Sequence, residues 1–127
     1  MEVREFFNAR AEQWDETLPK YLPARGAIAM LCGAGPGVHV LDIACGTGVM
    51  EPELLKLGAA RITAIDIAEN MVKKARENYN GEEKIRFVAC DLLEFEGGPF
   101  DCALLYNAYP HFPEKAAVLQ KVASLLK

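Results

Sequence analysis

The sequence predicts an α/β fold in which helices cover both faces of a parallel sheet. Three observations predict this fold. Apolar, strand-like runs alternate with helical segments, a glycine turn directly follows the first of these runs, and an acidic residue stands at or near the end of three of them. Strands that alternate with helices at this spacing form βαβ units, and right-handed crossovers then place helices on both faces of the sheet.

The first 33 residues predict two helices that precede the sheet. Apolar residues recur at three- and four-residue steps from Val3 to Trp14, which predicts a helix over residues 3–17. After two prolines interrupt this pattern, a second helix is expected over residues 24–32. The glycine-rich segment 33–37 ends that helix and forms a loop.

The core of the fold is expected over residues 38–127, within a single domain that spans the whole chain, 1–127. Its strands are nearly continuous apolar runs, as in strands that are buried on both faces. The expected strands are residues 38–44, 61–67, 85–90 and 100–106. Three helices are expected between and after them: one follows the glycine turn and ends at Leu57, and the others cover residues 68–79 and 114–127.

Composition excludes several classes of partner. The net charge is −4 and basic residues are interleaved with acidic ones, which argues against a nucleic-acid-binding surface. No apolar run approaches the ~20 residues that span a bilayer, and the charged N-terminus lacks the apolar stretch of a secretory signal. We therefore expect a cytoplasmic protein that binds neither membrane nor nucleic acid.

The cysteines predict no metal site. None of the four forms a CxxC pair, and three lie in or beside apolar runs, so reduced structural thiols are expected. The four are Cys32, Cys45, Cys90 and Cys102.

The glycine turn is the first candidate for a ligand site. A strand that contains Asp42 is followed by Ala44-Cys45-Gly46-Thr47-Gly48 and then by a helix. Small residues allow the backbone to approach a ligand closely, and a helix N-terminus offers free N–H groups. Alone, the turn is weak evidence, because a tight strand-to-helix connection without a ligand would have the same sequence.

Two further acids strengthen the prediction of a nucleoside site. Asp66 ends the second predicted strand, where a carboxylate can accept hydrogen bonds from both ribose hydroxyls, and Asp91 follows the third. Asp91 also suits the N-cap of a helix. Because ligands bind at the carboxyl edge of such sheets, three acids at this edge favour a binding site over three unrelated caps.

The turn distinguishes between two classes of nucleoside. A dinucleotide fingerprint has a third glycine, and Glu51 occupies that place here. The carboxylate of Asp42 would also repel a pyrophosphate, whereas it attracts a ligand that carries an ammonium and a sulfonium. Both observations favour S-adenosylmethionine (SAM) over NAD.

Four segments resemble, in order, the motifs of class I (Rossmann-like) SAM-dependent methyltransferases. They are residues 40–48, 64–71, 87–92 and 100–107, with Ala44 in place of the first glycine of the first motif. The resemblance implies methyl transfer from SAM to an unidentified, small-molecule acceptor, with S-adenosylhomocysteine (SAH) as the product. It also implies a sheet of order 3-2-1-4, truncated relative to the seven-stranded family fold.

The truncation predicts an open edge. Two explanations stay open: the chain is a fragment of a longer protein, which we favour, or a short protein that a partner completes. In the second case the nearly apolar fourth strand is expected to pair with its copy in a two-fold homodimer.

The resemblance also implies a role for each motif residue. Asp42, through its side chain or a water, and the backbone of Ala44, Gly46 and Gly48 would hold the methionine part of the cofactor. Asp66 would bind the ribose, Ile67 and Met71 would contact the adenine, and Asp91 with Leu92 would bind the adenine edge.

Asn107 would line the methyl-transfer face, and the helix that carries Arg10 and Trp14 resembles the family's N-terminal lid. Arg10 is expected to pair with the methionine carboxylate, unless it is an ordinary surface arginine.

Two residues after the fourth strand are weak catalytic candidates. His111 can take a proton from an acceptor, and Tyr106 can shape the acceptor pocket. In the alternative, both are ordinary residues of a loop. Two other functions also stay open: a cofactor-binding module without activity of its own, and, with less support, an NAD-dependent oxidoreductase.

Overall fold

A four-stranded parallel sheet forms the centre of the computed structural model, which describes residues 2–17, 23–106 and 111–127. The strands are β1 (His39–Ile43), β2 (Arg61–Asp66), β3 (Ile85–Ala89) and β4 (Cys102–Leu104), in the order β3-β2-β1-β4. This order confirms the predicted 3-2-1-4 arrangement. In the register, Val40 of β1 pairs with Ile62 on one side and with Cys102 on the other.

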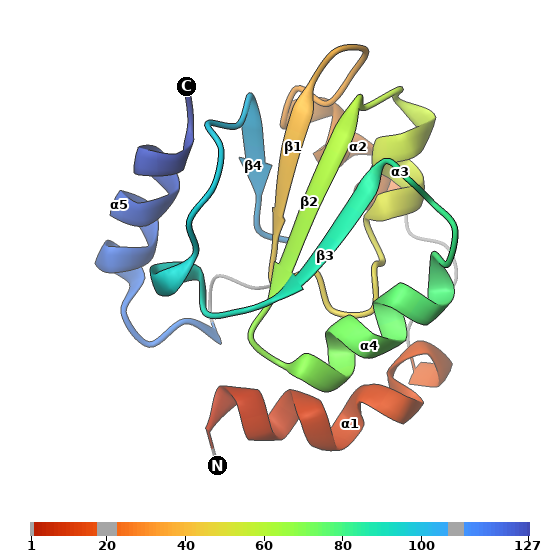
Figure 1. Ribbon diagram of the computed structural model, residues 1–127, viewed down its shortest axis with the longest axis vertical. Coiled ribbons are helices and arrows are strands. Elements are labelled where there is room, and N and C mark those ends of the chain that lie inside the picture. The colour runs from red at the N-terminus through yellow and green to blue at the C-terminus, as the bar shows by residue number, and fades with distance from the viewer. Residues whose placement is uncertain (1, 18–22, 107–110) are drawn as a thin grey trace.

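Helices cover both faces of the sheet, as predicted (Figure 1). They are α1 (Val3–Thr17), α2 (Pro23–Leu31), α3 (Glu51–Lys56), α4 (Glu69–Asn78) and α5 (Lys115–Leu125), with a 3-10 turn η1 at Leu92–Glu94. Alternate residues of the strands face opposite layers, because side chains alternate along a strand. Val40 and Ile62 pack towards α2 and α3, whereas Leu41 and Ile65 pack towards α5.

Strand β4 is shorter than the predicted residues 100–106. The backbone of Phe100 pairs with the end of α5 instead of with β1: its N–H donates to the Leu125 carbonyl at 2.8 Å, and its carbonyl accepts from Lys127 N–H at 3.0 Å. The apolar run therefore begins before the strand does, because Phe100 is buried in the core cluster that also holds Leu41 and Leu125, although its backbone does not pair with β1.

Helix α1 lies across the carboxyl ends of the strands and beside α4 (Figure 1). Ala11 packs against Ala68 and Met71, and all three are buried. The first helix is thus part of the ligand-binding edge of the sheet. Among the described residues, no helix is long and apolar enough to cross a membrane.

Candidate functional site

A cavity of about 860 Å³ lies at the carboxyl edge of the sheet. Its wall combines residues that follow all four strands with residues of α1 and of the segment before α5. Ten of the residues predicted from the sequence line it: Trp14, Ala44, Gly46, Asp66, Ile67, Met71, Asp91, Leu92, Tyr106 and His111. The volume lies within the range of small-molecule sites, which is about 300–1,000 Å³.

The glycine turn after β1 has the backbone that close approach to a ligand requires. Ala44, Gly46 and Gly48 all have positive φ, of 56°, 58° and 95°. Glycine adopts these angles without strain, whereas alanine does not. Gly46 faces the cavity, and a Cβ there would lie 3.9 Å from Nε1 of Trp14.

Replacing Ala44 with glycine is expected to stabilise the protein. The left-handed conformation costs an alanine about 1–2 kcal/mol, and the greater freedom of glycine in the unfolded chain offsets part of this. We expect the free energy of unfolding in urea to rise by up to about 1 kcal/mol. A loss of stability would show that the methyl group contributes packing that outweighs the strain.

Asp66 fixes the turn to the end of β2. Its Oδ2 accepts from Gly46 N–H at 2.8 Å, and its Oδ1 accepts from Ala68 N–H at 2.9 Å. Burial raises the pKa of Asp66, and the two backbone N–H groups partly oppose that rise. Because each carboxylate oxygen can accept more than one hydrogen bond, Asp66 retains acceptor capacity towards the cavity.

The residues after β3 form the next part of the wall. Asp91 lines the cavity, but its Oδ1 also accepts from Leu93 N–H at 2.9 Å, as an N-cap of η1. The structural and the binding interpretation of Asp91 are therefore compatible. Leu92 lies beside it, and Ile67 and Met71 complete an apolar stretch of the wall.

Asp42 and Gly48 are not among the lining residues. Asp42 is 1% exposed and lies behind the turn, where its carboxyl group contacts that of Glu51, which is 0% exposed. A Cβ on Gly48 would lie 2.5 Å from the Tyr79 ring, so this glycine is required by packing. In this arrangement neither Asp42 nor Gly48 is in direct contact with the cavity.

Helix α1 closes one side of the cavity through Val3, Phe7 and Trp14. These residues share one face of the helix, whereas Arg10 does not reach the cavity wall. The Arg10 guanidinium donates to the Phe6 carbonyl at 2.9 Å and lies 3.6 Å from the centre of the Phe6 ring. This geometry fits the surface-arginine alternative.

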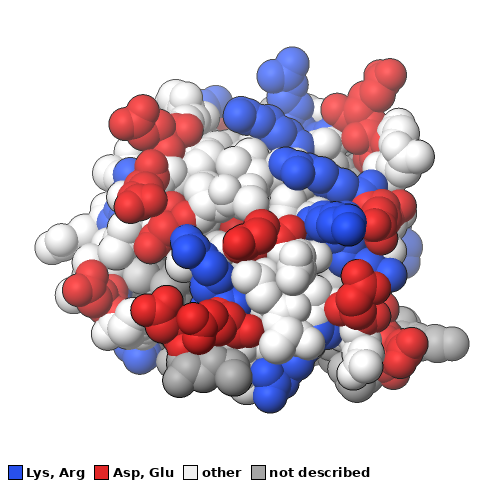
Figure 2. Space-filling view, turned by 60° about the horizontal axis from the view of Figure 1, so that its bottom comes forward, with Lys and Arg blue, Asp and Glu red and all other residues white. Residues whose placement is uncertain are grey.

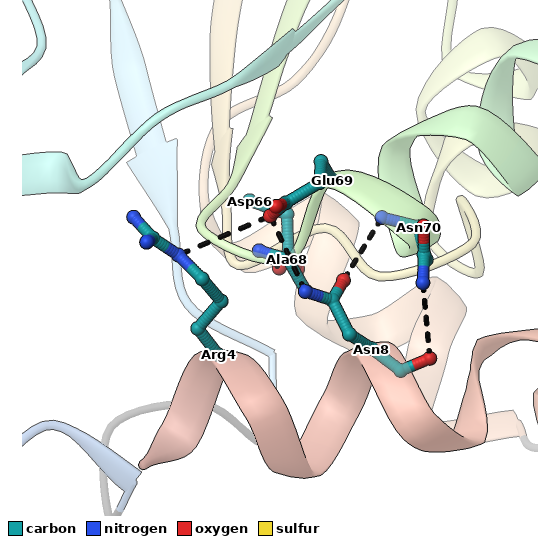
Figure 3. A network of polar contacts seen from close by, with 6 residues as sticks. All are labelled: Arg4, Asn8, Asp66, Ala68, Glu69 and Asn70. Atoms are coloured by element: carbon teal, nitrogen blue, oxygen red, sulfur yellow. Dashed lines mark hydrogen bonds and ion pairs between the residues drawn. The ribbon is translucent and has the colours of Figure 1, made fainter.

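Polar contacts tie α1 to the start of α4 (Figure 3). Asn8 Oδ1 accepts from Asn70 N–H at 2.9 Å, and Asn8 Nδ2 donates to Glu69 at 3.3 Å. Ala68 occupies the N-cap position of α4, and its side chain makes no capping hydrogen bond. Asn8 of α1 caps α4 in its place. Near the other end of α1, Asp15 accepts from the hydroxyl of Thr47 in the glycine turn.

Replacing Asn8 with alanine is expected to loosen α1 over the cavity. Loss of a capping side chain costs about 1 kcal/mol, so the free energy of unfolding should fall by about that amount. Amide hydrogen exchange of Asn70 should also become faster. Asn80→Ala, in the exposed turn after α4, is the matched control and should change neither quantity.

The two weak catalytic candidates both line the cavity. The His111 ring packs edge-to-face on Phe7 with centroids 5.5 Å apart, and Tyr106 lies under the guanidinium of Arg25 at 5.9 Å. Asn107, predicted to line the methyl-transfer face, lies outside the described residues.

Sequence reasoning missed several lining residues. Arg4, Val3 and Phe7 line the cavity from α1, although only Trp14 and Arg10 were singled out on that helix. Their spacing was the available signal, since Val3, Phe7 and Trp14 recur at one- and two-turn intervals. The two small residues Cys45 and Cys90 were missed because they were interpreted only as buried thiols.

Comparison with known proteins identifies the family. Residues 40–127 match the family described as methyltransferase domain, which is more than half of the chain. The chain belongs to the class I methyltransferases. The resemblance predicted from its four motifs is thereby confirmed.

Individual relatives agree with this assignment. The chain is 34% identical over 112 residues to a ubiquinone biosynthesis O-methyltransferase of Xanthomonas campestris, a match that covers 84% of this chain and 43% of the relative. Among solved structures, magnesium protoporphyrin IX methyltransferase from Synechocystis PCC 6803 with bound SAM has a TM-score of 0.78 and 25% identity, covering 98% of this chain and 70% of that one. A complex named DhpI-SAM-HEP has a TM-score of 0.77 and 26% identity, covering 97% and 58%. The chain thus spans less than half the length of the curated relative.

Proposed function

We propose that this chain binds SAM in the cavity at the strand ends and takes part in methyl transfer to a small-molecule acceptor. The observation that carries the proposal is the cavity wall, where a glycine turn with positive φ adjoins the carboxylates of Asp66 and Asp91. Two solved relatives that contain SAM, magnesium protoporphyrin IX methyltransferase and the DhpI-SAM-HEP complex, support it.

The charge of the cavity favours this ligand over NAD. Glu2, Asp66, Asp91 and Glu114 line it, and Arg4 is the one lysine or arginine among its described lining residues. An acidic wall attracts the ammonium and the sulfonium of SAM and opposes a pyrophosphate. On the face that carries α1, basic side chains gather in a band with acidic side chains around it (Figure 2). Because the wall of the cavity itself is acidic, we propose a small-molecule substrate and not a nucleic acid.

The residues present fit the cofactor in size and chemistry. Asp66 would accept from the ribose hydroxyls while it holds Gly46, and Asp91 would accept from the adenine amino group. Ile67, Met71 and Leu92 would pack against the adenine ring. SAM supplies a methyl group on a sulfonium that is already activated, so the protein contributes mainly binding and orientation.

The acceptor would enter between α1 and the segment before α5. The O-methyltransferase name of the curated relatives supports a hydroxyl acceptor. His111 lines the cavity and would take the hydroxyl proton at a ring nitrogen. The relatives extend beyond the part that this chain matches. Turnover by this chain, compared with turnover by a full-length relative, separates an active enzyme from a cofactor-binding module.

Isothermal titration calorimetry with SAM, SAH and NAD tests the cofactor. We expect SAM and SAH to bind at one site per chain, and NAD to give no heat of binding. NAD binding with no SAM binding would replace this proposal with an oxidoreductase.

A further inference from the structure

The turn that faces the cavity covers a pair of buried carboxyl groups that the proposed cofactor contacts do not use. Asp42 and Glu51 are 1% and 0% exposed, and Asp42 Oδ2 and both Glu51 carboxyl oxygens receive no N–H or O–H from another described residue. The two carboxyl groups are neighbours, and each acts on the pKa of the other. Without a proton the pair would place two like charges side by side with no donor between them, and with one proton the protonated carboxyl can donate to the other. A carboxylate cannot donate, so such a bond requires one proton between them.

We propose that Asp42 and Glu51 share one proton beneath the glycine turn, and that binding of the cationic cofactor on the other side of the turn releases this proton to solvent. This inference rests on the proposed binding of SAM. At neutral pH, SAM carries an ammonium, a sulfonium and a carboxylate, and so has a net charge of +1. The pair carries one negative charge while it shares the proton, so release of the proton leaves two buried carboxylates opposite the bound cation.

The groups around the pair favour a proton in the free protein. Burial and the neighbouring Glu51 and Asp66 carboxyls raise the pKa of Asp42 well above its usual range, and Cys32, just after α2, acts in the same direction. Burial also raises the pKa of Glu51. From α4, the ring of Tyr79 closes the site, with its hydroxyl donating to the Gly48 carbonyl instead of to a carboxyl. Arg25 of α2 acts on Tyr79 and lowers the pKa of its hydroxyl, against the larger effect of burial.

The pair acts electrostatically across the turn. Cys45 lines the cavity, and both Asp42 and Glu51 raise the pKa of its thiol. A positive charge placed in the cavity is therefore expected to lower the pKa of Asp42 in return, because the interaction of two sites is reciprocal.

The direction of the pH dependence follows from this coupling. Between the lowered pKa of the complex and the raised pKa of the free protein, each binding event releases up to one proton. In that window, affinity for SAM should rise with pH by up to about tenfold per pH unit, and it should level off on either side. SAH lacks the sulfonium charge and should release less.

Two measurements test the inference. The first is carbon-13 NMR titration of the side-chain carboxyls in the ligand-free protein, in which Asp42 should stay protonated through neutral pH. In Glu51→Gln the amide can donate to Asp42, which should then ionise at a lower pH. Two ionised carboxylates at neutral pH in the wild type would overturn the shared proton, whatever the ligand.

The second measurement is calorimetric titration with SAM in two buffers of different ionisation enthalpy. The wild type should release a proton, whereas Glu51→Gln and Asp42→Asn should release none, with a Tm measured for each variant to confirm folding. SAM binding without proton release, or with equal release in Glu51→Gln, would refute the coupling and leave the proposed function intact. Absence of SAM binding would refute both, and NMR would still decide whether the proton is shared.

Discussion

Replacing Asp66 with alanine is expected to weaken SAM binding by about 10- to 150-fold, the equivalent of 1.5–3 kcal/mol for a hydrogen bond to a charged group. In the ligand-free structure the same carboxylate accepts from Gly46 N–H and Ala68 N–H. The substitution also leaves these two donors unpaired, at about 1–3 kcal/mol each where they are buried. Asp66→Ala should therefore lose both affinity and stability.

Calorimetry well below the Tm of the variant, together with urea unfolding, separates the two losses. Asp101→Ala is the matched control, because Asp101 also accepts from a backbone N–H, that of His39, but does not line the cavity. This control should bind SAM as the wild type does. Unchanged affinity in Asp66→Ala would remove Asp66 from the binding site.

The sheet order and the part of the cavity wall at the strand ends were predictable, because both depend on short motifs that lie where strands end. The strand order came from the resemblance of the four motifs to the methyltransferase family. Residues at the carboxyl ends of parallel strands necessarily meet at one edge of the sheet. Asp66 and Asp91 were located in this way. Asp91 also illustrates the limit of such reasoning, because sequence cannot show that one carboxylate serves as cap and wall together.

The environment of Asp42 was not predictable from its motif. Its place before the glycine turn suggested direct contact with a ligand, whereas the structure buries it against Glu51. Glu51 was interpreted only as the residue that replaces a third glycine. Its burial follows from helix geometry, since Glu51 and Leu54 lie three residues apart on the face of α3 that packs on the sheet.

The two glycines of the turn are expected to respond differently to alanine substitution. At Gly48 (φ 95°), the new Cβ would lie 2.5 Å from Cε2 of Tyr79 and 3.3 Å from Oε2 of Glu51. The ring cannot retreat easily, because the Tyr79 hydroxyl donates to the carbonyl of Gly48 itself. Overpacking and backbone strain cost about 1–3 kcal/mol each, so Gly48→Ala should lower the free energy of unfolding by about 3 kcal/mol or more.

At Gly46 the added methyl group meets open space, with Nε1 of Trp14 as its nearest neighbour at 3.9 Å. Backbone strain alone should cost about 1–2 kcal/mol of stability. The methyl group, however, would occupy the cavity where the backbone approaches the ligand, so Gly46→Ala should impair SAM binding more than folding. Urea unfolding and calorimetry of both variants measure this contrast.

A double-mutant cycle with Tyr79→Ala identifies the cause of the Gly48 effect. Removing the ring removes the overlap, so Gly48→Ala should cost less in the Tyr79→Ala background than in the wild type. The same cycle with Gly46→Ala should be additive, since the Gly46 methyl group does not meet Tyr79. Additivity at Gly48 would mean that backbone strain, and not contact with the ring, makes glycine necessary there. A larger loss of affinity for Gly48→Ala than for Gly46→Ala, at matched stability, would contradict the assignment of Gly46 to the cavity wall.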